Sequence, residues 1–436
     1  MKMTKYKLSE LVEVTRGASL SGQFYAEEGK LIRLTLGNFN INGGGFKENT
    51  SKTDLYFTGT VRDEFILNEG DIITPLTEQS LGLLGTTARI PESGKYIQSQ
   101  DVALVRCKKG LLDPNFCYYL ISSSIVRQQL SAAAQQTKIR HTSPEKIKDC
   151  TVWVPDFDVQ KNIGRILTDI DNKIAINRQI NDNLEAMAKQ LYDYWFVQFD
   201  FPNEEGMPYK SSGGEMVWNE KLKREIPKGW EVKHLGDIIE TNRGISYNTS
   251  SISGGGVPMI NLASFNVNGT YKDAGIKTYN GLYTKEKVLK PFDLVLCNTQ
   301  QTAIDFSKDI IGKAFLVPDV FEGDIVSSHH INTIKTEDYY KAYIAYLSNT
   351  SHFHKYAAGC CSGTNILGLD FNSFSQYKME IPPVYLLEEF QKIIIDIVKR
   401  ESVIIKENKT LTKLRDELLP LLMNGQATVN YHLSAC

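Results

Sequence analysis

The sequence has no long apolar run and no cysteine pattern that would define its class. Nowhere in the 436 residues does an apolar stretch approach the roughly 18 residues needed to span a bilayer, so we expect no transmembrane segment. Residues 1–17 carry neither the apolar core nor the small-residue cleavage site of a signal peptide. The 7 cysteines are an odd number without CxxC spacing, which argues against a disulfide framework or a zinc ribbon. We therefore expect a soluble protein with reduced cytoplasmic thiols.

An excess of positive charge is also missing. The chain has 49 Lys and Arg against 51 Asp and Glu, which gives a net charge of -2. A protein that binds DNA by itself is usually basic. DNA binding is therefore expected only if the positive charge is local, or if a partner supplies the rest.

Catalytic and metal-binding signatures are absent from the sequence as well. No GxxxxGK[ST] phosphate loop occurs, so we expect no ATP hydrolysis by this chain. The segment DPNF at 113–116 resembles the motif of amino-methyltransferases, but Asn115 replaces a proline and no glycine-rich cofactor loop accompanies it. Asp113 as a helix N-cap, followed by Pro114, explains the segment better. The histidines at 329–330 have no further ligands at metal-site spacing, and we predict no metal.

What the sequence does contain is a repeat. LSELVEVTRGAS at 8–19 matches LGDIIETNRGIS at 235–246, and GNFNING at 37–43 returns as ASFNVNG at 263–269. The register shifts by small gaps and then returns to the same offset further along the chain. Gaps that cancel in this way are hard to obtain by chance, so we infer an internal duplication.

Each copy begins with short β-rich runs and Gly/Asn turns and ends in a long helix with an apolar heptad seam. The first seam comprises Ile163, Leu167, Ile170, Ile174, Asn177, Asn181, Leu184, Ala188, Leu191 and Trp195, and the second comprises Phe390, Ile394, Ile397, Glu401, Ile404, Asn408, Leu411, Arg415, Leu418 and Leu422. Seams of this length predict a coiled coil. Asn181 and Asn408 hold equivalent positions, where a buried Asn would fix the register of the helices. The alternative is that both lie at a solvated edge.

The expected fold class is α+β, with two similar globular domains separated by two long antiparallel coiled-coil helices and related by a pseudo-two-fold axis. The predicted segments are a first domain over 1–158, a helix over 159–198, a linker over 199–229, a second domain over 230–385, and a helix with a C-terminal cap over 386–436. Pro420 should break the second helix near its end. The aromatic residues of the linker indicate that it lies against a surface.

This architecture favours a two-part target on a linear polymer, and DNA is the obvious one. At about 1.5 Å per residue each helix would be roughly 55 Å long. Two readers on such a pair would contact sites at most roughly 16 bp apart, since DNA rises about 3.4 Å per pair. Two-fold-related readers usually meet half-sites about 10 bp apart. Parallel helices would instead place both domains at the same end.

Loops rich in Asn, Gln, Ser and Thr supply candidate base readers, because Asn and Gln bond bidentately to adenine and each such pair discriminates by about 1–3 kcal/mol. The candidates in the first copy are Asn38, Asn40, Thr77, Gln79, Ser80, Gln98, Ser99 and Gln100. Those in the second copy are Asn266, Asn298, Gln300, Gln301, Thr302, Ser328, His329, His330 and Asn365. Corresponding loops carry different side chains, as readers of different DNA words should. For the Asn-Gly pairs at 42–43 and 268–269, a tight turn is the favoured interpretation.

Local positive charge supplies candidate phosphate contacts. The segment 127–148 carries five basic residues against Glu145 as its single acidic residue. The candidates are Arg16, Lys138, Arg140, His141 and Arg243. Phosphate contacts of this kind are independent of sequence and sensitive to salt. The alternatives are a solvated helix face for the segment, and a structural role at a strand end for the two arginines that precede a glycine in both copies.

With these features in place, the chain resembles the DNA-specificity subunit of a type I restriction–modification system. The resemblance covers nearly the whole chain and rests on the two-copy layout and on four segments. These are IPKGWEVKHLGDI (226–238), WVPDFDVQKNIGRIL (153–167), WFVQFDFPNEEGMPYKSSGGEMVW (195–218) and LLPLLMNGQ (418–426). Together the segments are specific, whereas any one of them alone would be weak.

The resemblance implies a non-catalytic subunit that reads an asymmetric, bipartite site in double-stranded DNA, one half with each target-recognition domain. It implies that the helices dock two methyltransferase subunits, which carry S-adenosylmethionine, and that restriction subunits using ATP and magnesium join them. This chain would then bind no cofactor itself and would act on nucleoid DNA in the cytoplasm. Partners would supply much of the phosphate-binding surface. The alternatives are a stand-alone methyltransferase or nuclease with duplicated readers, and a scaffold whose repeats bind protein or glycan.

Overall fold

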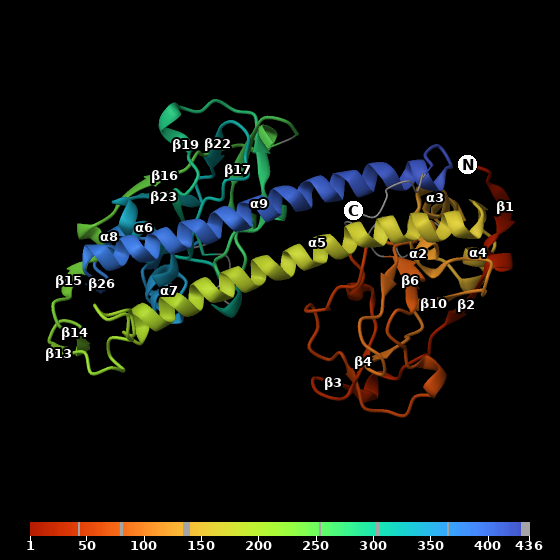
Figure 1. Ribbon diagram of the computed structural model, residues 1–436, viewed down its shortest axis with the longest axis horizontal. Coiled ribbons are helices and arrows are strands. Elements are labelled where there is room, and N and C mark those ends of the chain that lie inside the picture. The colour runs from red at the N-terminus through yellow and green to blue at the C-terminus, as the bar shows by residue number, and fades with distance from the viewer. Residues whose placement is uncertain are drawn as a thin grey trace. The chain divides into compact units, whose positions relative to one another are not determined.

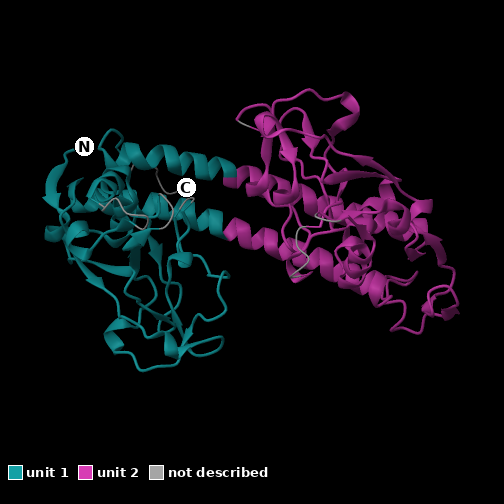
Figure 2. Ribbon diagram, turned by 180° about the vertical axis from the view of Figure 1, so that it is seen from behind, with its two compact units in different colours: residues 1–175, 409–436 teal, residues 176–408 magenta. Residues whose placement is uncertain are grey.

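The computed structural model describes residues 1–41, 44–78, 82–133, 140–252, 254–300, 306–363 and 366–428 of the chain. The chain folds into two compact units, of which unit 1 comprises residues 1–175 and 409–436 and unit 2 comprises residues 176–408 (Figure 2). The long helices α5 (Phe157–Tyr192) and α9 (Val384–Met423) are labelled in Figure 1, and each contributes one part to unit 1 and another part to unit 2 (Figure 2).

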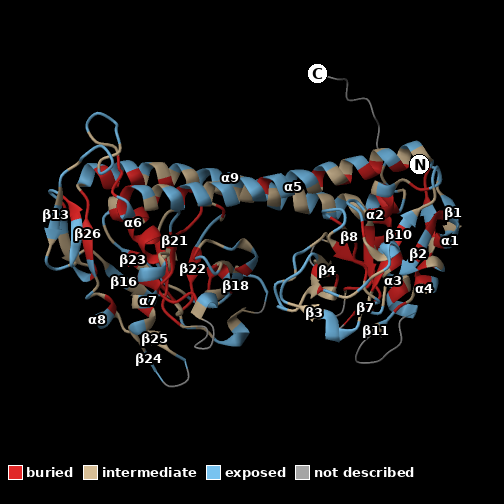
Figure 3. Cartoon of the chain, turned by 90° about the horizontal axis from the view of Figure 1, so that it is seen from below, coloured by how far each residue is buried: buried red, intermediate tan, exposed pale blue. Residues whose placement is uncertain are grey.

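Unit 1 contains a four-stranded antiparallel sheet whose inner strands are largely buried (Figure 3). Its order is β2 (Val12–Arg16), β10 (Val102–Cys107), β6 (Ile72–Pro75) and β8 (Ala88–Arg89). A second sheet has the order β3 (Tyr25–Ala26), β5 (Tyr56–Phe57), β4 (Leu31–Arg33) and β9 (Tyr96–Ile97). Two further strand pairs are β1 (Thr4–Lys7) with β12 (Thr151–Val154), and β7 (Thr77–Glu78) with β11 (Arg140–His141). The short helices of unit 1 are α1 (Leu8–Leu11), α2 (Pro114–Ser122), α3 (Ser124–Ala133) and α4 (Pro144–Lys148).

Unit 2 contains the corresponding sheets. The antiparallel sheet has the order β16 (Glu240–Arg243), β23 (Ile331–Lys335), β20 (Leu294–Cys297) and β21 (Ala314–Leu316). The second sheet has the order β18 (Lys277–Tyr279), β17 (Val257–Ile260), β22 (Ile325–Ser327) and β19 (Val288–Leu289). Further strand pairs are β13 (Met216–Asn219) with β14 (Arg224–Pro227), β15 (Glu231–His234) with β26 (Lys378–Ile381), and β24 (Cys361–Ser362) with β25 (Gly368–Leu369). The short helices are α6 (Asp338–Ser348), α7 (Ser351–Gly359) and α8 (Phe371–Phe374).

The two units repeat one topology, which confirms the predicted duplication. In each second sheet one neighbouring pair is parallel, β4 with β9 in unit 1 and β17 with β22 in unit 2. In each antiparallel sheet the edge strand is followed by a glycine, Gly17 or Gly244. A Cβ atom at either position would lie 2.2 Å from a carbonyl oxygen, that of Gln98 or that of Ser328. Because only glycine tolerates so close an approach, the residue recurs where the backbone contact recurs.

The long helices run antiparallel within each unit, as predicted. In unit 1, Ile163 and Leu167 near the start of α5 share one apolar core with Leu422 near the end of α9. In unit 2, Tyr192 at the end of α5 shares a core with Phe390 near the start of α9. Every residue of the two predicted seams is buried or half-buried. The heptad pattern therefore identified the face along which the helices pack.

A polar contact joins the two helices within this seam. Asn177 donates from Nδ2 to Oδ1 of Asn408 at 2.9 Å and to Oε2 of Glu407 at 2.7 Å. Asn181, the predicted register residue of α5, has a buried Oδ1 without a hydrogen-bond partner among the described residues. Equivalence under the repeat does not make two positions partners, because the antiparallel register decides which residues face each other.

Two expectations for the ends of the long helices have different outcomes. Pro420 lies inside α9, which continues to Met423, so the predicted break is wrong. A proline so near the end of a helix removes few hydrogen bonds, and its carbonyl still accepts from the amide of Asn424 at 3.0 Å. The linker, in contrast, lies against unit 2 as its aromatic residues predicted. Phe201 is buried and its ring stacks on that of Trp230, with ring centroids 5.4 Å apart.

Two carboxyl groups meet where the long helices pack in unit 2. Glu185 on α5 and Glu401 on α9 both line a cavity of about 1040 Å³. The hydroxyl of Tyr346, from α6, donates to Oε2 of Glu185 at 3.4 Å. Burial raises the pKa of Glu185 to about 7. Burial, together with repulsion from Glu185, raises the pKa of Glu401 to about 8.

In unit 1, the corresponding tyrosine contacts a carboxylate that forms an ion pair with an arginine. Tyr119, at the repeat position of Tyr346, donates to Oδ2 of Asp171 at 2.6 Å. Arg415 of α9 lies 2.9 Å from Oδ1 of the same carboxylate. A tyrosine therefore contacts an α5 carboxylate in both units, and the residue from α9 is a cation in one and a second acid in the other.

Candidate nucleic-acid interface

The predicted reader loops meet the Arg-Gly strand ends in both units. In unit 1 the amide of Ala18 donates to the carbonyl of Gln98 at 2.9 Å, next to Arg16 and Gly17. In unit 2 the amide of Ile245 donates to the carbonyl of Ser327 at 2.7 Å. The loops that follow β9 and β22 are therefore held beside the ends of β2 and β16. Each unit thus brings a predicted phosphate contact next to predicted base readers.

Six predicted residues of unit 2 form one group, which we call the unit 2 reader cluster: Arg243, Asn298, Gln300, Ser328, His329 and His330. Arg243 donates from Nε to the carbonyl of His329 at 2.9 Å. Asn298 donates from its amide to the carbonyl of His330 at 2.9 Å and from Nδ2 to that of His329 at 3.1 Å. The strand end of β16, the segment after β20 and the loop after β22 are thereby joined.

The histidines of this cluster are neutral hydrogen-bonding groups at pH 7. Burial, with repulsion from His329 and Arg243, lowers the pKa of His330 to about 4. Burial likewise lowers the pKa of His329 below its usual value. Nδ1 of His330 lies 3.0 Å from Oγ1 of Thr299. A neutral imidazole has one donor and one acceptor nitrogen, so these rings suit polar contacts better than phosphate charge.

Three polar atoms of the same cluster are buried without a hydrogen-bond partner among the described residues. They are Oε1 of Gln300, Oγ of Ser328 and Nδ1 of His329. Such atoms are few in folded proteins, and each marks strain, an unseen water or ion, or a functional role. Their grouping at one predicted reader is the strongest local sign of a binding function in unit 2.

Sequence reasoning missed one member of this network. Asn332 in β23 accepts a hydrogen bond at Oδ1 from Nδ2 of Asn298. The available signal was an asparagine at a buried position of the strand INTIK, where an amide needs a partner.

Unit 1 differs from unit 2 at the corresponding position. Glu78 and Gln300 are each the third residue after the third strand of the antiparallel sheet. Oε2 of Glu78 accepts the amides of Gly82, Leu83 and Leu84 at 3.2, 3.0 and 3.0 Å. Oε1 of Glu78 lies 2.9 Å from Nη1 of Arg140. The Nη2 atom of Arg140 also donates to Oγ of Ser131 at 3.0 Å. Arg140, predicted to contact phosphate, is therefore engaged within the protein.

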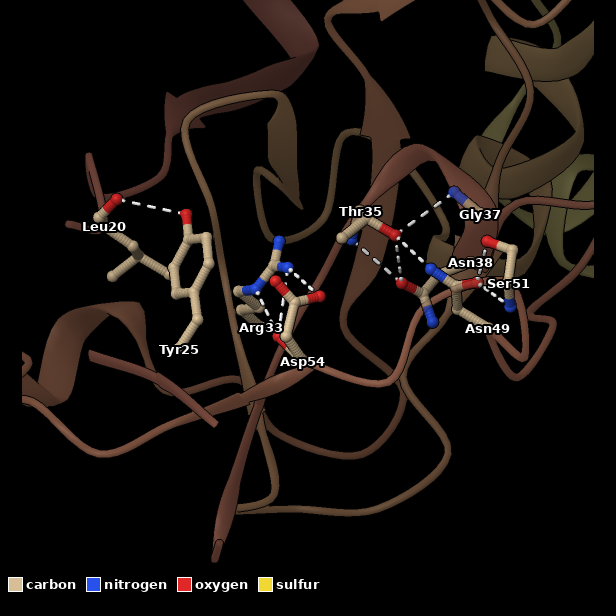
Figure 4. Close-up of polar contacts among 9 residues, drawn as sticks. All are labelled: Leu20, Tyr25, Arg33, Thr35, Gly37, Asn38, Asn49, Ser51 and Asp54. Carbon is tan, nitrogen blue, oxygen red and sulfur yellow. Dashed lines mark hydrogen bonds and ion pairs between the residues drawn. The ribbon is translucent and has the colours of Figure 1, made fainter. Parts of the chain in front are cut away.

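Several predicted base readers are internal. Asn38 is 2% exposed, and it accepts at Oδ1 from the amide of Thr35 at 2.9 Å (Figure 4). It also donates to the carbonyl of Lys47 at 3.1 Å. Gln98 is 1% exposed and donates from Nε2 to the carbonyls of Thr15 and Val102 at 2.9 and 3.0 Å. Burial and these bonds argue against a base contact for either side chain.

Figure 4 also shows a buried arginine that sequence reasoning missed. Arg33 in β4 donates from Nε to the carbonyl of Asp54 at 3.1 Å and from Nη2 to its carboxylate at 3.1 Å. Its guanidinium lies over the ring of Tyr25, 3.7 Å from the centroid. This arginine ties β4 to the segment before β5.

The repeated Phe-Asn phrase is a turn in unit 2. Asn266 donates from Nδ2 to Oγ1 of Thr270 at 2.9 Å, and Oδ1 of Asn268 accepts the amide of Thr270 at 3.2 Å. Gly269 has a φ of 95°, which favours glycine. The tight-turn interpretation of 268–269 is confirmed. In unit 1 the amide of Asn40 donates to the carbonyl of Gly45 at 3.2 Å, whereas the Asn-Gly pair at 42–43 lies outside the described residues.

The remaining candidates differ in exposure. Arg16, Gln100 and His141 are exposed, Ser99 is half-buried, and Thr77 is buried in β7. Six candidates lie outside the described residues: Gln79, Ser80, Lys138, Gln301, Thr302 and Asn365.

The DPNF segment is a helix start, as the N-cap interpretation predicted. Oδ1 of Asp113 accepts the amide of Phe116 at 3.0 Å, and Pro114 opens α2. Gln160 of α5 accepts the amide of Asp113 at 3.0 Å, which fixes this cap to the long helix. The segment therefore has a structural role in unit 1.

The described ranges show neither a metal-binding cluster nor a membrane-spanning helix. No group of three or more His, Cys, Asp or Glu side chains gathers there in an arrangement that could hold a metal ion. Within the same ranges, no helix combines the length and the apolar character that crossing a membrane requires.

The fold defines a class of duplicated α+β chains whose two β-rich domains are attached to long paired helices. This chain belongs to the family described as the type I restriction modification DNA specificity domain, which matches residues 1–186 and 227–416. The resemblance noted in the sequence is therefore confirmed.

Individual relatives are distant in sequence. The chain is 23% identical over 335 residues to the MjaIX type I restriction enzyme specificity subunit of Methanocaldococcus jannaschii, covering 74% of this chain and 71% of the relative. It is 24% identical over 386 residues to the HindI specificity subunit of Haemophilus influenzae, covering 76% and 81%. The crystal structure of a type I restriction-modification S subunit from M. genitalium matches with a TM-score of 0.59 and 15% identity, covering 97% of this chain and 96% of that one, and has the same fold.

Proposed function

We propose that this chain selects the DNA sequence for a type I restriction–modification complex and reads an asymmetric, bipartite site, one half with each unit. The observation that carries the proposal is one topology with different polar groups at corresponding positions. Glu78 of unit 1 corresponds to Gln300 of unit 2, and the residues at 98–100 correspond to those at 327–329. Two readers with one scaffold and different side chains suit two different DNA words.

The long helices offer a surface for the partner subunits. Ile176, Ile180 and Met187 of α5 are 52%, 40% and 62% exposed, and we call them the α5 apolar stripe. Their spacing of four and seven residues places them on one face of the helix, away from the buried seam. Exposed apolar side chains that line up on one face mark a protein interface. The proposed partners are two methyltransferase subunits, which the restriction subunits then join.

In this proposal the chain is not itself an enzyme and binds no cofactor. S-adenosylmethionine belongs to the methyltransferase subunits, and ATP with magnesium belongs to the restriction subunits. These partners also supply phosphate-binding surface, which accounts for the net charge of -2 on a DNA-reading chain. The complex acts on nucleoid DNA in the cytoplasm.

Methylation mapping with the complete complex tests this proposal. The chain is produced together with the methyltransferase subunits of the same system, and methylated adenines are mapped genome-wide with and without it. We expect methylation at one two-part sequence that requires this chain. A variant with all three α5 stripe residues changed to Ser should lose co-purification with the methyltransferase subunits, whereas substitution of exposed Lys173 by Ser should not.

Three outcomes would contradict the proposal. Methylation or cleavage by the purified chain alone would establish the alternative of a stand-alone enzyme. Retention of the full two-part specificity after disruption of one unit would refute bipartite reading. Unchanged methylation in the absence of this chain would leave it no role in DNA selection.

A further inference from the structure

We propose that Gln300 reads an adenine in the half-site of unit 2, by a bidentate contact that the corresponding Glu78 of unit 1 cannot make. The inference rests on the proposed function and adds to it a residue and a base. It starts from the unequal hydrogen bonding at one repeated position. Glu78 has its two carboxylate oxygens occupied by three backbone amides and Arg140, whereas Oε1 of Gln300 has no partner among the described residues.

The strand opposite explains the difference. In unit 1, β7 and β11 pair in the register Glu78 with Arg140, so the guanidinium lies directly across from the carboxylate. In unit 2, Thr299 pairs with Gly368, and the amide of Gln300 donates to the carbonyl of Leu367 at 2.8 Å. The residue across from Gln300 is thus a leucine, whose side chain has no donor. In unit 1 the residue opposite supplies a guanidinium donor, whereas in unit 2 the residue opposite Gln300 supplies no side-chain donor.

Adenine can supply a donor to Oε1 of Gln300. Its N6 amino group donates and its N7 accepts in the major groove, and this pair complements the oxygen and the NH₂ group of a glutamine amide. Gln300 as a residue is half-buried, and its Oε1 is buried, so the contact requires the side chain to turn toward the DNA. The terminal amide torsion of glutamine is broad, and rotation can turn both amide atoms toward a base. A carboxylate has acceptors alone and cannot make this contact.

The neighbours of Gln300 suit a DNA-facing position. Arg243 is exposed, and its side chain donates from Nε to the carbonyl of His329. His329 and His330 are uncharged at pH 7, as their lowered pKa values show, and so they add polar groups without competing for phosphate. The cluster therefore combines one accessible cation for the DNA backbone with neutral groups for the base edges.

A coupling experiment with modified DNA tests the contact. The holo-complex of this chain and its methyltransferase subunits is titrated with duplexes of its own recognition sequence. At each adenine of the half-site assigned to unit 2, one duplex carries 7-deazaadenine, which keeps N6 and lacks the N7 acceptor. For the wild type we expect one position at which this change weakens binding by roughly 5-fold or more. In the Gln300→Ala complex the same change at that position should have no further effect.

Two more variants separate the contact from folding. Gln300→Glu with Leu367→Arg rebuilds the unit 1 ion pair, so it should fold and lose the preference for adenine at that single position by roughly 5- to 150-fold. Gln376→Glu makes the same chemical change in the loop before β26 and should leave the recognition sequence unchanged. Methylation mapping in cells measures the recognition sequence of both the rebuilt variant and the control.

The outcomes distinguish this inference from the proposed function. An unchanged recognition sequence for the Gln300→Ala and rebuilt variants, or equal 7-deazaadenine effects in wild type and Gln300→Ala, would overturn the adenine contact and leave the specificity subunit intact. Loss of methylation at every site by an assembled complex would also overturn it, because the residue would then be needed for DNA binding as a whole and not for one base. Absence of sequence-specific methylation in the wild-type complex would instead contradict the proposed function.

Discussion

The carboxyl pair in unit 2 should make the stability of that unit fall as the pH rises. Glu185 and Glu401 have pKa values raised from 4.5 to about 7 and about 8. The folded unit therefore holds protons that the unfolded chain has already released above pH 4.5. The stabilising contribution is complete below about pH 4.5 and is lost as the pH rises through about 8.

The structure sets the size of the effect. For Glu401, a pKa raised from 4.5 to about 8 corresponds to an upper limit of about 5 kcal/mol of folding free energy once the group is ionised. Both side chains are half-buried, and the nearby Lys313 ammonium donates to the carbonyl of Val267, so it is not committed to either acid. Allowing for water and helix relaxation, we expect Glu401→Gln to raise the free energy of unfolding by about 2 kcal/mol at pH 8.5. At pH 5, where most of the stabilising contribution is still present, the gain should be less than about 1 kcal/mol.

Calorimetric unfolding of the full chain at several pH values measures this effect. A gain of about 2 kcal/mol in a unit of this size raises its Tm by about 4–8 °C. Glu388→Gln is the matched control, because Glu388 is exposed on the same helix. A Tm gain of the same size at pH 5 and pH 8.5, or none at pH 8.5, would show that the helices do not hold these protons.

Three other perturbations test the packing. Asn177→Ala should lower the free energy of unfolding by about 1–3 kcal/mol, because it removes the donor to Asn408, and urea denaturation measures the change. Gly17→Ala should destabilise unit 1 by more than about 2 kcal/mol, since its Cβ would strike backbone, whereas Gly359→Ala, with open space around it, should be nearly neutral in thermal unfolding. Arg415→Met should remove the cation beside Asp171, which keeps its bond from Tyr119, and cost about 1–3 kcal/mol in thermal unfolding.

Most of what the sequence predicted about the fold came from its heptad pattern and its internal repeat. The heptad seams were correct because an apolar stripe can be buried on one face alone, and the repeat implied one topology for both units. Pairing across the seam was not predictable, since the repeat relates Asn181 to Asn408 while the antiparallel register places Asn177 opposite Asn408. Glu401 stood in the predicted seam, but nothing in the sequence indicated that Glu185 would face it.

The candidate site was predicted from residue types, and a residue type does not indicate what its side chain will contact. Asn38 and Asn298 both stand in Asn-rich loops, yet the first closes a turn and the second joins three segments of the unit 2 reader cluster. The contrast between Glu78 and Gln300 was visible in the aligned repeats. Its meaning depended on Arg140 lying across from one of them and Leu367 across from the other, which the strand register decides.

The order of synthesis follows from the way unit 1 is assembled. Its core contains Leu8 and Phe116 from early in the chain and also Leu422 and Met423 from the end of α9. A ribosome has therefore translated all of unit 2 before the last side chains of unit 1 emerge. Unit 2 is one continuous stretch, 176–408, and can fold without waiting for later residues. The half of the protein that is made first is thus completed last, and it is the half that premature termination would damage.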